Sequence, residues 1–74
     1  MALKSNVLVK FGEKVKNIRK MRGLSQEELA EKACVHRTYI GMVERAEKNI
    51  TLNNILKIAV ALDVPIYKLF EEAD

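Results

Sequence analysis

The sequence predicts an all-α fold, a compact arrangement of five short helices in one domain that spans residues 1–74. Apolar residues recur every three or four positions in the first third of the chain, which is the spacing of an amphipathic helix. Signals that start and stop helices divide the rest, among them the capping-box pair Ser25 and Glu28 and the helix-breaking Pro65. The expected helices cover residues 6–21, 26–33, 36–45, 52–62 and 65–71.

The first helix is predicted from five apolar residues at intervals of four, four, three and three. These residues are Val7, Phe11, Val15, Ile18 and Met21. Gly12 lowers helix stability in this stretch, so we expect it to serve the close approach of another helix. Gly23 follows the last apolar residue and is typical of the left-handed position that ends a helix.

The second and third helices, over residues 26–33 and 36–45, are separated by a tight turn. Ser25 and Glu28 form S-x-x-E, in which each side chain satisfies a free backbone N–H of the other residue. Cys34 lies in the turn, and a left-handed backbone there would strain a residue other than glycine.

The last two helices are predicted over residues 52–62 and 65–71. Thr51 is the expected N-cap of the first of them, and its apolar stripe is Ile55, Ile58, Ala59 and Leu62. Pro65 ends this stripe and suits the first turn of the short final helix.

Composition limits the class of protein. One cysteine excludes an internal disulfide framework and fits a reducing compartment. The first twelve residues lack the apolar run and cleavage site of a signal peptide, and the longest apolar run, 58–62, is too short to span a membrane. We therefore expect a cytoplasmic protein that has no membrane partner.

Charge is distributed unevenly along the chain, whose net charge is +3. Residues 1–37 hold nine Lys and Arg and four Glu, whereas residues 38–74 hold four basic and six acidic residues. A basic first half favours a polyanionic partner. Charge alone is equally compatible with an ordinary solvated surface.

In the third predicted helix, Ile40 and Val43 share one face because they are three residues apart. Five residues are then left on the outward face, which carries arginine near both ends: Arg37, Thr38, Gly41, Met42 and Arg45. Two short helices, a tight turn and an anion-binding outer face are typical of a helix-turn-helix, whose second helix enters the DNA major groove.

The spacing of Gln26, Ala30, Ile40 and Val43 resembles the lambda-repressor-like (Xre-type) helix-turn-helix family. The flanking segments FGEKVKNIRKMRGLSQEELA and HRTYIGMVERAEKNITLNNILKIAVALDVP are similar to the controller proteins of bacterial restriction–modification systems. The resemblance covers residues 11–70 and implies a compact five-helix, lambda-repressor-like DNA-binding domain, with the helix-turn-helix at the second and third helices.

Arg37 is the first candidate for reading bases, because its planar fork matches the O6 and N7 atoms of guanine. Thr38 can donate to a base or contact a thymine methyl group. The resemblance places the triplet Arg37-Thr38-Tyr39 at the DNA. His36 and Met42 complete the set of candidates, with a solvent-exposed His36 as the alternative for that residue.

Contacts to the phosphate backbone are expected on both sides of these residues. Gln26 lies at the positive end of its helix, where free N–H groups favour an anion, and the family uses this glutamine on the DNA backbone. The full set of phosphate candidates is Ser25, Gln26, Arg45, Lys48, Asn49, Thr51 and Asn53.

The resemblance also implies an ion pair between Arg19 and Glu44, which would join the first helix to the end of the third. The alternative is a surface arginine that makes no fixed contact. Association into a homodimer is expected because two copies double the contacts with a pseudo-palindromic operator. The expected interface is Ile50, Leu52, Ile66, Leu69 and Phe70, although Leu69 or Phe70 could instead fill the small core.

The controller resemblance implies a transcriptional regulator of its own gene and of the endonuclease gene, able to activate and to repress. Activation requires a surface for RNA polymerase, and the candidates are Glu27, Glu28 and Glu31. The alternative for Glu28 is support of its own helix through Lys32.

Other classes of protein fit the sequence poorly. One His and one Cys, with no supporting acid, do not make a catalytic triad, and a metal site lacks ligands. No catalytic residue, metal or cofactor is therefore predicted. A phage-type repressor or antitoxin-like regulator whose main partner is another protein remains the alternative function.

Overall fold

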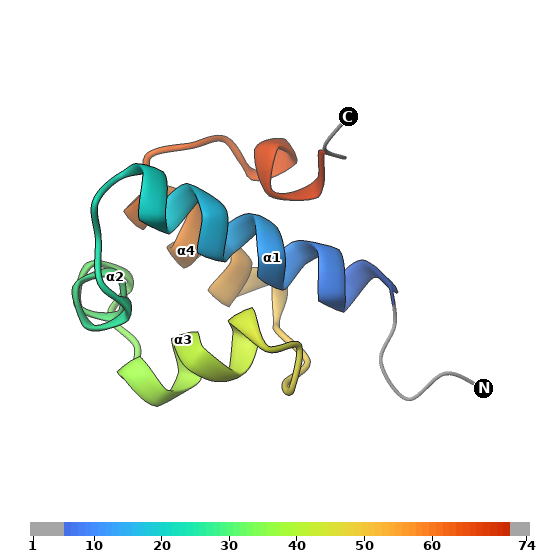
Figure 1. Cartoon of the computed structure of the whole chain (residues 1–74), viewed down its shortest axis with the longest axis horizontal. Coiled ribbons are helices and arrows are strands. Elements are labelled where there is room, and N and C mark those ends of the chain that lie inside the picture. The colour runs from blue at the N-terminus through green and yellow to red at the C-terminus, as the bar shows by residue number, and fades with distance from the viewer. Residues whose placement is uncertain (1–5, 72–74) are drawn as a thin grey trace.

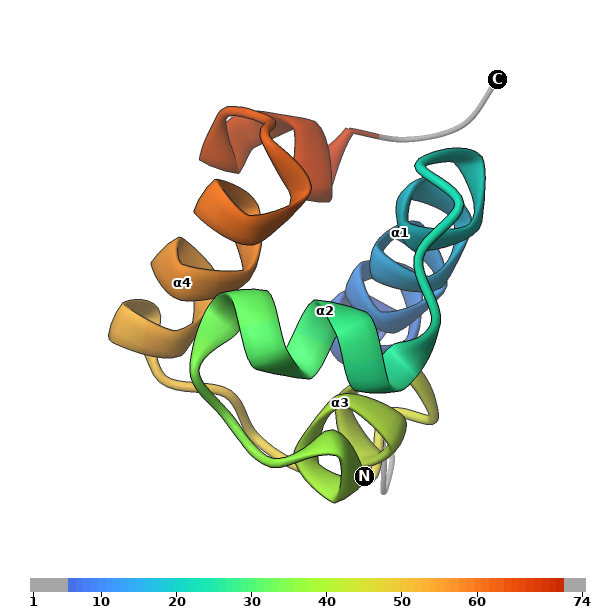
Figure 2. The same ribbon diagram turned by 90° about the vertical axis from the view of Figure 1, so that its left-hand side faces the viewer.

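The computed structural model describes residues 6–71, and all regular elements within this range are helices (Figure 1). They are α1 (Asn6–Met21), α2 (Gln26–Ala33), α3 (Arg37–Glu44), α4 (Leu52–Leu62) and the 3₁₀ helix η1 (Ile66–Phe70). In Figure 1, α1 lies across the molecule between α3 and η1, and Figure 2 shows the same two elements at opposite ends. The prediction of an all-α fold is confirmed for the described residues.

The predicted fifth α-helix over residues 65–71 is wrong, because this segment forms the short 3₁₀ helix η1. Its backbone is extended at Pro65 (φ −69°, ψ 154°), and no side chain caps its first N–H groups. The N–H of Lys68 donates to the Pro65 carbonyl at 3.0 Å, three residues back rather than four. A short uncapped helix closes its bonds in this tighter pattern.

Helix α3 is one residue shorter at each end than predicted over 36–45. His36 has extended backbone angles (φ −76°, ψ 145°) and is the N-cap, so the helix begins at Arg37. Arg45 has left the helical region (φ −92°, ψ 4°) and is the C-cap. The other three α-helices have the predicted bounds.

Gly12 brings α1 and α3 into backbone contact. A Cβ atom at this position would lie 2.5 Å from the carbonyl oxygen of Val43 and 2.9 Å from that of Glu44. Both oxygens belong to the last turn of α3. The predicted use of Gly12 for close helix approach is therefore confirmed.

The apolar face of α1 is shorter than the sequence predicts. Phe11 and Val15 are buried, and Ile18 is half-buried against the core. Val7 and Met21, in the first and last turns of α1, are instead 61% and 83% exposed. Figure 1 shows the N-terminal end of α1 extending past its neighbours.

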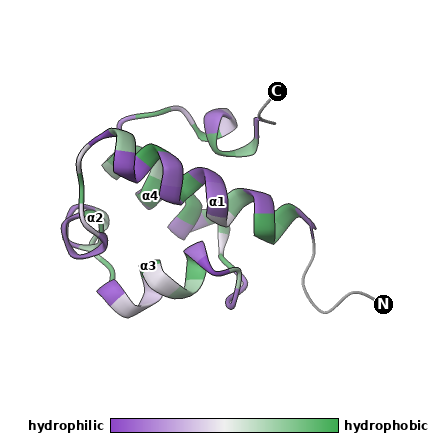
Figure 3. Cartoon of the chain, in the orientation of Figure 1, coloured by the Kyte–Doolittle hydropathy of each residue, from purple (hydrophilic) through white to green (hydrophobic). Residues whose placement is uncertain are grey.

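One side of each helix contributes side chains to a single hydrophobic core. Its members are Phe11, Val15, Leu29, Ala30, Ala33, Ile40, Val43, Ile55, Ile58, Ala59, Leu62 and Leu69. Figure 3 shows hydrophilic and hydrophobic turns mixed along α1, whereas α4 is largely hydrophobic. A core of this size is small, so individual contacts weigh heavily in the free energy of unfolding.

Cys34 has the left-handed conformation that the sequence left open, with φ 59° and ψ 42°. It ends α2 in a Schellman pattern, in which the N–H of Val35 donates to the Ala30 carbonyl at 3.0 Å. Gly23 ends α1 with φ 72°, as predicted. Ala46 and Asp63 also have φ 59°, which the sequence does not signal, because neither residue favours this region as glycine does.

Candidate nucleic-acid interface

The outer face of α2 and α3 forms a shallow depression lined by residues from both helices. Gln26 comes from the first turn of α2, and the remainder from the exposed side of α3 and its C-cap: Arg37, Thr38, Gly41 and Arg45. No carboxylate is part of this lining. The arrangement gathers two guanidinium groups, a hydroxyl and an amide, which suits an anion with hydrogen-bond acceptors.

Gly41 is buried although it lies on this outer face. A Cβ atom there would be 3.0 Å from Nη1 of Arg45 and 3.6 Å from Oε1 of Gln26. The absence of a side chain therefore lets the Arg45 guanidinium lie across α3. Arg45 also pairs with Glu47 at 3.1 Å, and Met42 is half-buried beside this surface.

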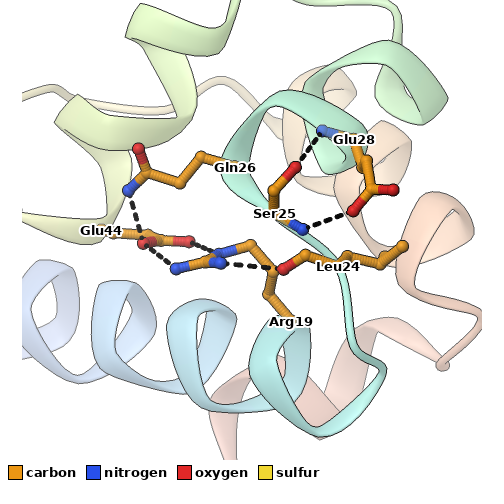
Figure 4. A network of polar contacts seen from close by, with 6 residues as sticks. All are labelled: Arg19, Leu24, Ser25, Gln26, Glu28 and Glu44. Carbon is orange, nitrogen blue, oxygen red and sulfur yellow. Dashed lines mark hydrogen bonds and ion pairs between the residues drawn. The ribbon is translucent and has the colours of Figure 1, made fainter.

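Beneath the depression, the carboxylate of Glu44 accepts three hydrogen bonds (Figure 4). Arg19 donates to it through Nε at 2.6 Å and through Nη2 at 3.1 Å, and Gln26 donates through Nε2 at 2.9 Å. Arg19 Nη1 also donates to the Leu24 carbonyl at 2.9 Å. Both charged side chains are buried, with 9% and 3% exposed. The bidentate ion pair expected between Arg19 and Glu44 is thus present, and its link to Gln26 was not anticipated.

Ser25 and Glu28 form the complete capping box at the start of α2, shown beside the Glu44 network in Figure 4. The Ser25 hydroxyl accepts from the Glu28 N–H at 3.0 Å, and the Ser25 N–H donates to the Glu28 carboxylate at 2.8 Å. The backbone and then the side-chain hydrogen bond with Ser25 hold the pKa of Glu28 below its usual range. The Ser25 hydroxyl accepts in this box, so its own proton can still be donated to a phosphate.

His36 is fixed by its role as the N-cap of α3. Its Nδ1 accepts from the Thr38 N–H at 3.1 Å. A neutral ring that accepts at Nδ1 carries its proton on Nε2, so His36 can offer DNA a single donor.

Arg37 and Thr38 follow directly and are exposed. The Arg37 guanidinium lies 3.9 Å from Glu27, in a pair whose side chains are 67% and 75% exposed. Exposed ion pairs of this kind contribute little to the free energy of unfolding.

Tyr39 differs from the two residues before it, because its ring is half-buried against the core. Its hydroxyl accepts a hydrogen bond from Asn54 Nδ2 at 3.1 Å. Asn54 was not among the candidates, and the structure shows that it is half-buried in α4, whereas its neighbour Asn53 is exposed. No local sequence pattern links residues 39 and 54, so only the fold reveals this contact.

The remaining phosphate candidates lie at the other end of α3. Lys48, Asn49, Thr51 and Asn53 are all exposed, in the α3–α4 loop and in the first turn of α4. Thr51 Oγ1 accepts from the Asn54 N–H at 3.2 Å and caps α4. Ser25 and Gln26, the candidates at the start of α2, differ from these residues in that Gln26 itself lines the depression.

The expected dimer surface is corrected in part. Leu69 is 1% exposed and belongs to the core, because η1 turns it inward. Ile50 and Ile66 are half-buried against the core. Leu52 is 75% exposed and Phe70 47% exposed, although the Phe70 ring stacks on Phe11 with centroids 5.2 Å apart.

Three exposed apolar residues were missed, namely Leu56, Val60 and Tyr67. Leu52, Leu56 and Val60 are each four residues apart and share one face of α4. We call this row the α4 stripe. The sequence did not separate this stripe from the buried face of α4, because eight of the eleven residues of LNNILKIAVAL are apolar.

The acidic candidates on α2 have different surroundings. Glu27 and Glu31 are exposed, whereas the Glu28 carboxylate is held by Ser25. All three line a second open hollow, which is completed by Ala30, Val35, His36 and Arg37.

In the described part of the chain, no cluster of three or more His, Cys, Asp or Glu could hold a metal ion. No helix among residues 6–71 has both the length and the apolar character to cross a membrane.

Comparison with known proteins gives one consistent result. A helix-turn-helix family model, HTH_3, matches residues 15–69. The control protein C.SmaI of Serratia marcescens is 49% identical over 59 residues, which are 80% of this chain and 70% of that protein. The crystal structure of the restriction–modification controller protein C.AhdI of Aeromonas hydrophila superposes with a TM-score of 0.84 at 49% identity, covering 85% of this chain and 96% of that one.

A second similar structure contains DNA. It is the tetramer of the restriction–modification controller protein C.Esp1396I in complex with its natural 35 base-pair operator. Its chain is 36% identical, with a TM-score of 0.84, and the match covers 90% of this chain and 88% of that one.

Proposed function

We propose a function on the premise that this chain belongs to the helix-turn-helix family HTH_3, and within it to the restriction–modification controller proteins. The chain is a sequence-specific DNA-binding regulator of a restriction–modification system, and it is not an enzyme. It acts in the bacterial cytoplasm, where its operator and gene lie. The observation that carries the proposal is the depression on α2 and α3, lined by two arginines, a threonine and a glutamine without a carboxylate.

In this proposal α3 enters the major groove. Arg37 reads guanine through its fork, Thr38 and Tyr39 read neighbouring groups, and His36 and Met42 lie at the two edges of the contact. Ser25 and Gln26 bind the backbone on one flank. The other flank is formed by Arg45, Lys48, Asn49, Thr51 and Asn53. These contacts position the protein on DNA without selecting a sequence.

The α4 stripe supports the proposal of a homodimer. Leu52, Leu56 and Val60 expose 75%, 49% and 70% of their surface on one face of α4. A second copy could cover this face and leave α3 free, because the depression lies on α2 and α3. The two-fold axis then requires half-sites about 34–36 Å apart in a pseudo-palindromic operator.

The dimer is tested by sedimentation of Leu56→Asp, with Asn17→Asp on the exposed side of α1 as a control for added charge. We expect the first variant to be monomeric and to lose cooperative operator binding, and the second to stay dimeric. A dimeric Leu56→Asp would show that another surface joins the copies.

We assign a contact with RNA polymerase to the exposed carboxylates of α2. Glu31→Lys is a cleaner test than Glu27→Lys, because Glu27 lies 3.9 Å from Arg37 and its reversal would also change DNA binding. Glu28 is left intact, since it holds the capping box. Glu31→Lys should abolish activation in a reporter assay while operator affinity is retained. Unchanged activation would remove this surface from the proposal.

The central experiment is a titration of the DNA upstream of the gene for this chain, by gel shift at several salt concentrations. Specific binding should fall steeply with salt. Arg37→Ala should relax preference at one base pair in each half-site, by about 1–3 kcal/mol. Lys48→Ala should weaken binding to all sequences and reduce the salt slope by about one.

Two results would contradict the proposal. Normal operator binding by Arg37→Ala would mean that α3 does not read the bases. Failure of the wild-type chain to bind this DNA, together with a stable complex with a neighbouring gene product, would favour the protein-partner alternative.

A further inference from the structure

We propose that Asn54 is a positioning residue of the interface, which orients the Tyr39 hydroxyl so that this group meets DNA as a hydrogen-bond donor. The inference rests on the proposed function, because it requires α3 to contact DNA. It concerns a residue of α4 that is half-buried and lies behind the base-reading helix.

The contact is held in place from both sides. Asn54 Nδ2 donates to the Tyr39 hydroxyl oxygen at 3.1 Å. The backbone of Asn54 is fixed in turn, because its N–H donates to Thr51 Oγ1 at 3.2 Å in the α4 cap. Tyr39 belongs to the first turn of α3, its N–H donates to the His36 carbonyl at 3.0 Å, and its ring packs against the core. Each backbone is therefore fixed by a helix start, and the Tyr39 ring is held by the core.

The direction of this bond determines what Tyr39 offers to DNA. A phenol hydroxyl accepts and donates close to the plane of its ring, on opposite sides of the oxygen. Because the Asn54 amide occupies the accepting side, the hydroxyl proton points away from Asn54. Tyr39 can then donate to a phosphate oxygen, to guanine O6 or N7, to adenine N7 or to thymine O4. The amino groups of cytosine and adenine, which are donors, find no equivalent acceptor.

Asn54→Asp is the sharpest test, because it changes the polarity of the contact with almost no change in shape. A carboxylate only accepts hydrogen bonds, so the Tyr39 hydroxyl would turn its proton inward and present a lone pair to DNA. The new negative charge lies in the first turn of α4, where the helix dipole favours it, so the fold should be retained. A thermal melt of the variant checks this point.

The charge itself would also weaken DNA binding, and Tyr39→Phe separates the two effects. Repulsion between the carboxylate and DNA acts whether or not the hydroxyl is present. Loss of the donor acts only when it is present. Operator affinity is therefore measured for the wild-type full chain, both single variants and the double variant, on the upstream duplex that the wild type binds.

We expect Asn54→Asp to weaken binding by about three- to tenfold more in the wild-type background than in the Tyr39→Phe background, the factor that one neutral hydrogen bond is worth. Asn54→Ala, which leaves the hydroxyl free to rotate, should lie between the wild type and Asn54→Asp. Equal losses in the two backgrounds would overturn the inference and leave only a charge effect.

Unchanged or tighter binding by Asn54→Asp would also overturn it, because the hydroxyl would then already donate to the side chain of residue 54. Both outcomes leave operator binding by the wild type intact. They are thus distinct from failure of the proposed function, in which the wild type itself binds no upstream DNA.

Discussion

The buried network around Glu44 should lose more stability when one charged partner is removed than when both are removed. Replacement of one charged partner, as in Arg19→Met or Glu44→Leu, leaves the other buried without its counter-charge. Such a loss typically costs about 3–5 kcal/mol. Replacement of both partners by apolar groups removes the uncompensated charge and is often close to neutral.

The structure sets the scale of these losses. Arg19 and Glu44 expose 9% and 3% of their side chains, so solvent compensates neither. In the double variant the Leu24 carbonyl and the Gln26 amide each lose a partner, at about 1 kcal/mol or more each. A chain of 74 residues has a total stability of about 4–11 kcal/mol. Each single variant should therefore lose about 12 °C or more in Tm, and the double variant clearly less.

Urea and thermal unfolding followed by circular dichroism measure these differences. The exposed pair of Lys68 and Glu71, 3.4 Å apart, is a matched control. Its side chains are 48% and 46% exposed, so either replacement should change stability by less than about 1 kcal/mol. Additive losses at Arg19 and Glu44, or single losses as small as in the control, would refute the reasoning that the network clips α1 to α3.

Three further predictions concern the backbone and the capping box. Gly12→Ala should destabilise the chain by about 1–3 kcal/mol, because the added methyl group overpacks against α3. At an exposed site such as Asn17, alanine instead favours the helix. A Tm of Gly12→Ala above that of the wild type would contradict the prediction. Cys34→Gly should raise Tm, because relief of left-handed strain of about 1–2 kcal/mol exceeds the entropic cost of glycine, and a clear fall in Tm would mean that the turn differs. The lowered pKa of Glu28 means that its capping contribution to stability is fully present above pH 4.5 and is lost as pH falls through the folded-state pKa. The free energy of unfolding, measured from pH 7 to pH 3, should therefore fall less in Glu28→Gln than in the wild type. An equal dependence of stability on pH in the two proteins would exclude the linkage.

Most of the fold can be predicted from signals between residues that are close in the sequence. The capping box of Ser25, the stop at Gly23 and the spacing of apolar residues each act within a few positions, and the structure retains them. The final helix was predicted wrongly because five residues after Pro65 fit either an α or a 3₁₀ turn. In the observed 3₁₀ helix, Leu69 lies in the core.

The interface was less predictable where it depends on contacts between distant segments. The pair of Arg19 and Glu44 could be expected because a whole family pattern marks both positions. The hydrogen bond between Tyr39 and Asn54 leaves no such mark, because it depends on how the fold places the first turn of α4 beside the first turn of α3. The α4 stripe was also hidden, since a helix that is apolar nearly all round has no periodicity from which to read its exposed side.

Helix α1 connects α3, which is proposed to read DNA, with η1, whose Phe70 is an exposed member of the dimer surface expected from the sequence. Phe11 stacks on Phe70 at 5.2 Å, while the next residue, Gly12, touches the backbone of the last turn of α3. A contact between two backbones cannot be adjusted by side-chain rotation, so a shift of α1 must move α3 as well. Two recognition helices in a dimer must match half-sites about 34–36 Å apart, which requires the angle between α3 and the dimer surface to be fixed. Gly12 should therefore matter more for binding to a full operator than to a single half-site.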